Sequence, residues 1–181
     1  EPQIYFSELS VKDAAKVVSL MDSDDAVDVL ETLDDKKKYE IVENLDKAAI
    51  KDVKMLLSYD DDEIGSCMTT NYICIPKGLS VRQAMSELVR QAGTNDNIST
   101  IYVLDESLKF AGAIDLKDLI IAREHDVLDD IIVHSYPSVT DHEKIDECME
   151  KIMDYSEDSI PVLSQDGHML GVCLLYTSDA A

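Results

Sequence analysis

Apolar residues recur at helical spacing through residues 8–58, and small polar residues interrupt them at regular intervals. Four candidate N-cap residues, Ser10, Asp22, Asp34 and Asp46, stand about twelve residues apart. Each is followed by apolar side chains three and four residues apart, the spacing that forms one face of a helix. The pattern predicts four short helices. Because units of this size cannot bury an apolar face alone, we expect them to stack on one another as a solenoid.

The pattern changes after Tyr59 to short apolar runs separated by turns. Strands are predicted at residues 72–75, 101–104 and 110–114, and a helix at residues 116–123. Ser80 is the expected N-cap of a further helix between the first two strands. The apolar face of that helix would hold Val81, Ala84, Met85, Leu88 and Val89.

The second half of this region repeats the first, which is the strongest internal signal in the chain. At an offset of 64 residues, Ile75, Val81, Ala84, Met85, Leu88 and Val89 match Val139, Ile145, Cys148, Met149, Ile152 and Met153. After a loop shortened by five residues, Ile101, Val103, Leu104, Phe110 and Gly112 match Ile160, Val162, Leu163, Met169 and Gly171 at an offset of 59. We therefore expect two α/β copies that pack as a pseudo-twofold pair. The predicted fold class is α+β, with an all-helical, superhelical N-terminal domain followed by this pair.

The composition is strongly acidic, with 38 Asp and Glu residues against 16 Lys and Arg and a formal net charge of −22. Such a surface repels nucleic acid and anionic lipid, so neither is an expected partner, and it attracts cations. A merely solubilising acidic surface is the simpler alternative. No run of 18 apolar residues occurs, so we expect no membrane insertion of this part of the chain. The four cysteines lack paired metal spacing and fit an intracellular location.

The repeat, with its segment Gly-Ala-Ile-Asp-Leu-Lys-Asp at residues 112–118, resembles the CBS motif. Two CBS motifs normally form one globular unit with adenine-nucleotide clefts between them. The segment before the repeat indicates which family of CBS-containing proteins the chain resembles. This part of the chain is similar to the junction between the helical domain and the first CBS motif of the MgtE family of magnesium channels. The similarity lies in helical repeats that end at residues 57–59, followed by an acidic run, Gly65, Met68-Thr69 and Tyr72. The resemblance covers nearly everything from residue 9 to residue 172.

The resemblance implies a division of the chain. We expect a partial helical MgtE N-type domain at residues 1–58, an acidic junction at 59–71, a first CBS motif at 72–126 and an incomplete second motif at 127–172. Residues 173–181 depart abruptly from the family pattern and resemble a translated sequencing adapter, so we expect a non-native tail there. A divergent native end is the alternative. The family's helical domain normally has more repeats, so we expect the front to be missing too.

The family resemblance also implies magnesium ligands. Mg²⁺ takes oxygen ligands and is usually held by one or two carboxylates plus waters. Asp24 and Asp28 are four residues apart and share one face of the second predicted helix. In the family, these positions face the second CBS motif and the pore, where ions stabilise the closed state. The alternative is that Asp24 and Asp25 serve the helix N-terminus while Asp28 is solvated.

Further ligand candidates come from the same resemblance. Asp146 and Glu147 stand near the start of a predicted helix where the family often has acidic residues, although the neighbouring acidic position is Lys144 here. Ser66 falls where the family often has glycine and a backbone carbonyl can face an ion. We expect the acidic run at residues 60–63 to be a solvated linker first and an attractor of cations second.

A nucleotide is a less favoured ligand. Asp118 matches the position where CBS motifs often hold a ribose through its two hydroxyls. Three residues earlier, Asp115 replaces the hydroxyl that usually contacts phosphate, and a carboxylate repels phosphate unless a metal intervenes. Thr100 stands where some family members stack an aromatic ring on adenine. We therefore keep ATP as a second ligand beside Mg²⁺.

The sequence thus predicts a non-enzymatic, magnesium-sensing region of an MgtE-type channel or transporter, at the cytoplasmic face of the cell membrane. Its histidines are scattered, and no P-loop or dinucleotide fingerprint occurs. The expected partners are the protein's own transmembrane domain and a second copy, bound through the CBS pair. One alternative is an adenine-nucleotide-sensing CBS module of another transporter or enzyme. Another is a helical interaction domain with a degenerate CBS pair.

Overall fold

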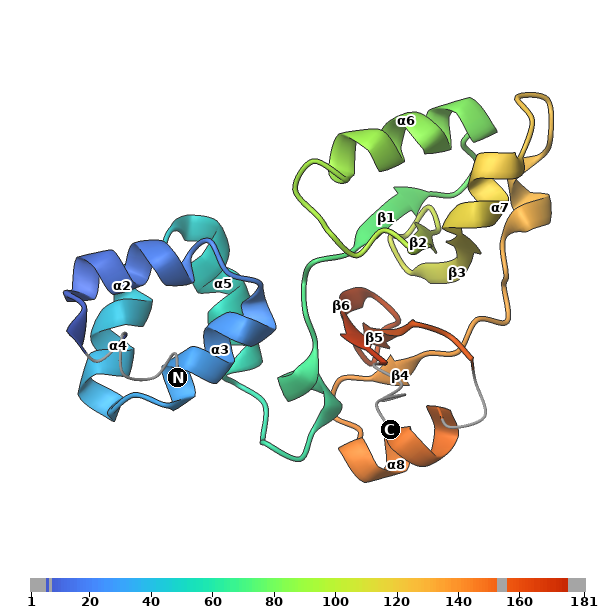
Figure 1. Cartoon of the computed structure of the whole chain (residues 1–181). Coiled ribbons are helices and arrows are strands. Elements are labelled where there is room, and N and C mark those ends of the chain that lie inside the picture. The colour runs from blue at the N-terminus through green and yellow to red at the C-terminus, as the bar shows by residue number, and fades with distance from the viewer. Residues whose placement is uncertain (1–5, 7, 153–155, 176–181) are drawn as a thin grey trace, which may run out of the picture.

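The computed structural model describes residue 6, residues 8–152 and residues 156–175, and these residues form two lobes joined by a short connection (Figure 1). The first lobe is helical, with α2 (Val11–Val18), α3 (Ser23–Glu31), α4 (Asp35–Glu43) and α5 (Lys47–Leu56). The second lobe contains two small mixed sheets and their helices. The α+β fold class predicted from the sequence is confirmed.

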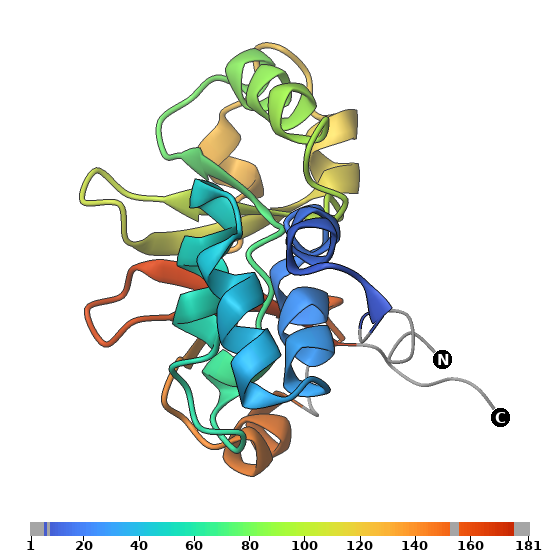
Figure 2. The same ribbon diagram turned by 90° about the vertical axis from the view of Figure 1, so that its left-hand side faces the viewer.

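The four helices of the first lobe begin at the expected caps. The side chains of Ser10, Asp34 and Asp46 accept hydrogen bonds from the first-turn amides of α2, α4 and α5. Asp22 precedes α3 without capping it, because its Oδ1 accepts from Asn71 Nδ2 instead, at 2.8 Å. Within the lobe, α3 packs on α5 and α2 packs on α4. Figure 2 looks onto this lobe, with the two sheets lying one above the other behind it.

Each copy of the repeat forms a three-stranded sheet of the same topology. In the first, β1 (Ile73–Pro76) is parallel to β2 (Thr100–Leu104), which is antiparallel to β3 (Phe110–Asp115). In the second, β4 (Val139–Thr140), β5 (Ser159–Leu163) and β6 (Met169–Leu174) repeat this arrangement. Helices α6 (Val81–Gln91) and α7 (Leu116–Ile121) belong to the first copy and α8 (Ile145–Ile152) to the second. The structure therefore confirms the repeat.

Each copy also receives a segment from the chain that leads into the other. The 3₁₀ turn η1 (Ile64–Cys67) leads to Thr69, which pairs with Val172 of β6 through backbone hydrogen bonds of 2.8 and 2.9 Å. The turn η2 (Leu128–Ile131) leads to Val133, which pairs with Ala113 of β3. The segment before each motif thus crosses to the sheet of the other motif, and the two motifs form one unit.

The matched glycines of the repeat lie where these crossing segments pass. A β carbon on Gly112 would stand 2.7 Å from Ile132 Cγ2 and 2.8 Å from Val133 O. One on Gly171 would stand 2.8 Å from Thr69 O. Gly112 also has a φ of +150°, a conformation that residues with a side chain rarely adopt. Glycine is therefore required at both points for the backbones to approach.

Apolar burial connects the helical lobe to the second motif. One buried cluster runs from α2–α5 through Ile64 and Met68 to Val139 and Ile160 of the second sheet. The first sheet has a separate cluster with α6 and α7. A small third cluster around Tyr102 joins the two sheets. The segment after α5 therefore packs against both the helical lobe and the second motif, through Ile64 and Met68.

The structure corrects three details of the sequence interpretation. The helix expected at residues 116–123 ends at Ile121, because Ala122 adopts an extended backbone. Val89 is 68% exposed, because α6 packs on its sheet through Val81, Ala84 and Leu88. Strand β6 includes residues 173 and 174, so the first residues of the expected foreign tail continue the sheet, while residues 176–181 lie outside the described part.

Candidate functional site

The start of α3 carries a cluster of carboxylates: Asp22, Asp24, Asp25 and Asp28. Asp24 is half-buried, and its Oδ1 atom is buried with no hydrogen-bond partner among the described residues. Burial first, and then the charges of Asp24, Asp22 and Asp28, raise the pKa of Asp25. A carboxylate oxygen that has no partner and lies among other negative charges is unfavourable until a cation neutralises it.

Asp24 lies near enough to the second sheet for its charge to act on a residue of β6. Its charge helps to raise the pKa of the Cys173 thiol in β6, after burial and the nearby thiols of Cys67 and Cys148. Asp28, one turn further along α3, is exposed. Asp24 is thus half-buried and close to the second motif, whereas Asp28 is open to solvent.

The other ion ligands expected from the sequence are spread around the second motif. Ser66 lies in η1, and its hydroxyl donates to the Glu63 carbonyl at 2.8 Å. Asp146 and Glu147 are exposed in the first turn of α8. Among the described residues, no three His, Cys, Asp or Glu side chains converge closely enough to hold a metal ion. An ion here would rely on one or two carboxylates and on water or backbone oxygens, as Mg²⁺ commonly does.

The acidic run at residues 60–63 is exposed at Asp60, Asp61 and Asp62, as expected of a solvated segment, but the second motif also holds it in place. Lys144 Nζ lies 2.6 Å from Asp62 Oδ1, and His142 Nδ1 lies 2.9 Å from Glu63 Oε1. Backbone hydrogen bonds join the same two segments. Two carboxylates of the run therefore have protein cations or imidazole as partners. The only signal for this in the sequence is the basic Lys144 among acidic neighbours.

His142 lies beside two carboxylates at this junction, and its pKa is shifted by them. The hydrogen bond to Glu63, followed by the charge of Asp141, raises the pKa of His142. The Tyr59 ring lies against the imidazole, with ring centroids 5.3 Å apart. The Tyr59 hydroxyl donates to Asp141 Oδ2 at 3.0 Å. A protonated His142 thus lies between two carboxylates, one from the junction and one from the second motif.

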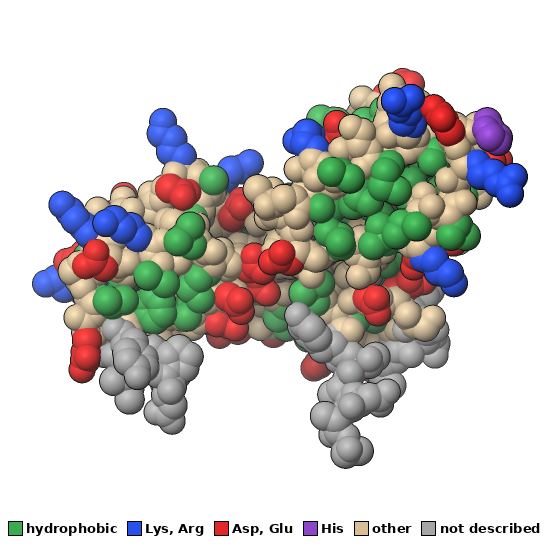
Figure 3. Space-filling view, turned by 45° about the horizontal axis from the view of Figure 1, so that its top comes forward, with side chains coloured by type: hydrophobic (Ala, Val, Ile, Leu, Met, Phe, Trp, Pro, Cys, Tyr) green, Lys and Arg blue, Asp and Glu red, His purple; other side chains and the backbone are tan. Residues whose placement is uncertain are grey.

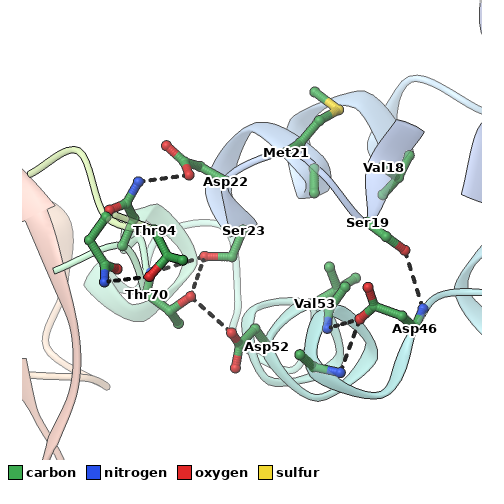
Figure 4. Close-up of a pocket in the computed structure, with 15 residues that line it drawn as sticks. Val18, Ser19, Met21, Asp22, Ser23, Asp46, Asp52, Val53, Thr70 and Thr94 are labelled. Atoms are coloured by element: carbon green, nitrogen blue, oxygen red, sulfur yellow. Dashed lines mark hydrogen bonds between the residues drawn. The ribbon is translucent and has the colours of Figure 1, made fainter. Parts of the chain in front are cut away.

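A cavity of about 280 Å³ lies between the helical lobe and the first motif (Figure 4). Helices α3 and α5 form one wall, and residues 70–71 and 94–95 form the other. Asp22, Asp46 and Asp52 line the cavity, but each carboxylate already accepts a hydrogen bond from the protein. The cavity therefore lies at the interface of the helical lobe and the first motif, and the three carboxylates that line it already have hydrogen-bond partners in the protein.

A second cavity, of about 320 Å³, lies at the nucleotide position expected from the sequence. Asp115, Lys117, Asp118 and Glu157 line it. Asp115 Oδ1 caps α7 by accepting from the Lys117 amide at 2.7 Å. The equivalent space in the other copy, lined by Tyr102, encloses only about 40 Å³. Of these two equivalent clefts, the one at Asp118 is therefore the more open, and its carboxylates oppose a bare phosphate.

Comparison with known proteins identifies both lobes. Residues 3–62 match the model of the MgtE intracellular N domain, and residues 63–125 and 128–175 each match the CBS domain. The magnesium transporter MgtE of Enterococcus faecalis is 33% identical over 121 residues, which cover 67% of this chain and 27% of that protein. The crystal structure of the soluble part of a magnesium transporter has a TM-score of 0.89 at 31% identity, covering 96% of this chain and 68% of that one. The cytosolic domain of the Mg²⁺ channel MgtE, solved in complex with ATP, has a TM-score of 0.81 at 25% identity, covering 95% and 75%.

The fold and these matches define a CBS-pair protein with an attached helical N domain. The chain belongs to the MgtE family of magnesium transporters. It spans 27% to 35% of the length of the curated relatives it matches, which are transporters and not enzymes. In the part of the chain that the structure describes, no helix has the length and apolar character needed to cross a membrane.

Proposed function

We propose that this chain is the cytosolic Mg²⁺-sensing region of an MgtE-type transporter, and that ion binding here gates a transmembrane pore. The observation that carries the proposal is the buried Oδ1 of Asp24, which has no hydrogen-bond partner among the described residues and lies close to the second motif. A buried acceptor left unsatisfied costs about 1–3 kcal/mol, and more when it is charged. A bound cation would remove that cost.

Asp24 and Asp28 are the residues proposed to hold the ion. They lie one helical turn apart on α3, and Mg²⁺ prefers one or two carboxylates with several retained waters. Asp25 would add negative charge beside them. Asp146, Glu147 and the backbone carbonyl of Ser66 are proposed as secondary contacts around the second motif.

Gating follows from the difference in ion affinity between two arrangements of the lobes. At low Mg²⁺, the unneutralised carboxylates of α3 would favour movement of the helical lobe away from the acidic second motif. At high Mg²⁺, the bridging ion would stabilise the compact arrangement, which shifts the population by the differential affinity. The partner that senses this shift is the protein's own transmembrane domain, which places the chain at the cytoplasmic face of the membrane.

Titration of the chain with MgCl₂ tests this proposal. We expect the radius of gyration to fall and proteolysis between residues 57 and 61 to slow as Mg²⁺ rises. The paired substitutions Asp24→Asn and Asp28→Asn should abolish both changes. Asp35→Asn, an exposed carboxylate in the first turn of α4, is the matched control and should leave them intact. An identical radius and cleavage rate in EDTA and in millimolar MgCl₂ would refute ion-driven compaction.

A second copy of the chain is the proposed partner of the α6 and α7 side. Val89, Ile120, Ile121 and Val127 are 60% to 68% exposed. Figure 3 shows apolar side chains gathered on this part of the molecule. Contiguous exposed apolar surface typically marks an interface. Sedimentation should show a dimer that Ile121→Asp dissociates, while Leu108→Asp, at an equally exposed hairpin position, should leave it intact.

An adenine nucleotide is the second proposed ligand. The open cleft at Asp118 favours it, as does the ATP complex of the related cytosolic domain. Asp118 would accept the ribose hydroxyls, whereas Asp115 and Glu157 oppose phosphate, so we expect ATP to bind only together with Mg²⁺. Calorimetry with ATP and AMP, with and without Mg²⁺, tests this. Heat that survives Asp118→Ala unchanged, or no heat under any condition, would contradict it.

A further inference from the structure

The two copies of the repeat differ most between the helix and the second strand. The offset between them falls from 64 to 59 residues across this stretch, so the first copy has five residues more. In the structure, the longer connection of the first copy lies between α6 and β2 and contains residues 93–97, here called the 93–97 loop. Because only the first copy has the longer loop, we expect this loop to make a contact that the second copy does not make.

The 93–97 loop reaches toward the helical lobe. Thr94 and Asn95 line the cavity opposite α3 and α5 (Figure 4). The Asp96 amide donates to Asn71 Oδ1 at 2.9 Å, and Asn97 Nδ2 donates to the Asn71 carbonyl at 2.9 Å. The extra residues therefore fix the position of Asn71.

Asn71 in turn holds α3. It is 92% buried, and its Nδ2 donates to Asp22 Oδ1 at 2.8 Å, the residue before α3 begins. Next to it, the Thr70 amide donates to Ser23 Oγ at 3.0 Å, and Thr70 Oγ1 donates to Asp52 Oδ2 of α5 at 2.9 Å. A satisfied, buried polar network of this kind fixes one relative position of the elements that it joins.

The second copy provides an internal comparison. At the offset of 64 residues, His134 and Ser135 stand where the first copy has Thr70 and Asn71. Both are exposed, and no helical lobe lies against them among the described residues. The buried asparagine and the longer loop thus occur together, in the copy that contacts α3 and α5.

We propose that Asn71 and the 93–97 loop form a metal-independent docking site for the start of α3, about which the helical lobe pivots. The inference rests on the proposed function. Asp24 lies two residues beyond Asp22, so a start of α3 that stays docked would limit how far the ion-binding carboxylate moves from the second motif when the rest of the helical lobe swings away at low Mg²⁺. Docking of this kind raises the effective concentration of one ligand group for the other. Asn71 is therefore a positioning residue that sets ion affinity without touching the ion.

Amide exchange of the full chain, followed residue by residue by NMR in EDTA and during an MgCl₂ titration, tests the proposal. In EDTA, we expect the Thr70 amide of the wild type, which donates to Ser23 of α3, to be protected because docking does not need the ion. The Asp96 amide, which donates to Asn71, should be protected because the loop holds Asn71. Asn71→Ser introduces the residue that the other copy has at this position. It should lower the protection factors of the Thr70 and Asp96 amides about tenfold and raise the midpoint of the Mg²⁺ titration about tenfold. Each change corresponds to the loss of roughly one to two buried hydrogen bonds. Asn44→Ala, which removes an exposed hydrogen bond to Glu40, is the matched control and should change neither.

Two outcomes would overturn the docking site: wild-type Thr70 and Asp96 amides that exchange at the unprotected rate in EDTA, or an unchanged midpoint in Asn71→Ser. If that variant unfolds, deletion of residues 93–97, which gives the loop the length it has in the other copy, should likewise reduce protection of the Thr70 amide and raise the Mg²⁺ midpoint. Protection of the β2 amides reports whether the motif stays folded. A wild type that is protected in EDTA but indifferent to Mg²⁺ would refute the proposed ion sensing and leave the docking site supported.

Discussion

Replacing Asp24 by Asn should have opposite effects on the metal-free and the magnesium-bound protein. Asn keeps the size of the side chain but removes the charge from an Oδ1 atom that is buried without a partner. An unsatisfied buried charged group costs about 1–3 kcal/mol or more, and a neutral amide costs less. The charge at a helix N-terminus is itself worth about 0.5 kcal/mol, which the variant loses. The net expectation is a metal-free variant more stable than the wild type by about 1 kcal/mol.

In the presence of magnesium, the wild type should be more stable than Asp24→Asn. At an ion concentration ten times the dissociation constant, a site in the folded state alone contributes about 1.4 kcal/mol of stability. The wild type should gain this amount, and Asp24→Asn should gain almost none of it. For a chain of this size, each kcal/mol moves the melting temperature by about 2–4 °C, so both effects are measurable.

Thermal unfolding by circular dichroism, in EDTA and over an MgCl₂ series, measures both effects. Asp35→Asn, in the first turn of α4, is the control for the lost helix-terminus charge and should be slightly destabilised with a normal magnesium response. The reasoning fails if Asp24→Asn melts below the wild type in EDTA. It also fails if the variant gains as much from Mg²⁺ as the wild type does.

Three further predictions concern the junction and the CBS pair. Gly112→Ala should cost about 2–4 kcal/mol in chemical denaturation, from a positive φ and contacts below 3 Å, whereas Gly93→Ala, whose new β carbon would meet only Arg90 O at 3.9 Å, should be nearly neutral. The folded-state pKa of His142 is raised, so its contribution to stability is complete below its unfolded pKa and is lost as pH rises through the higher folded value. His142→Gln should therefore flatten the pH dependence of the melting temperature above about pH 6.5, and a wild type whose stability rises there would contradict this. Tyr102→Phe should cost about 1–2 kcal/mol, because Ser159 Oγ loses a buried hydrogen bond of 2.6 Å; an unchanged denaturation midpoint would count against it.

The local pattern of the sequence predicts the elements well because most of them are specified by neighbours. The helix starts at residues 11, 35 and 47 follow caps whose side chains bond within three residues. The repeat is legible because both sheets bury the same positions, down to the register shifts after Val103 and Val162. Asp22 is the exception among the caps, because its partner is Asn71 in the other lobe.

The candidate site is less predictable, because its features depend on segments far apart in sequence. The spacing of Asp24 and Asp28 and the family resemblance point to one face of α3, but spacing says nothing of burial. Asp24 Oδ1 is buried without a partner in the fold, and the charge of Asp24 acts on Cys173 of β6, some 150 residues later. The ion pair of Asp62 with Lys144 is likewise a contact between distant segments, so the acidic run reads as a linker in the sequence.

The crossing of the lead-in segments has a consequence for the order of folding. Thr69 pairs with Val172, roughly a hundred residues further on, so the first motif's own leading segment has no sheet to join until the end of the second has been synthesised. The edge of β3 at Ala113, by contrast, waits only until Val133 has been synthesised, twenty residues later. We therefore expect a nascent chain to complete the paired motifs in one late, cooperative step, after residue 172 has been synthesised.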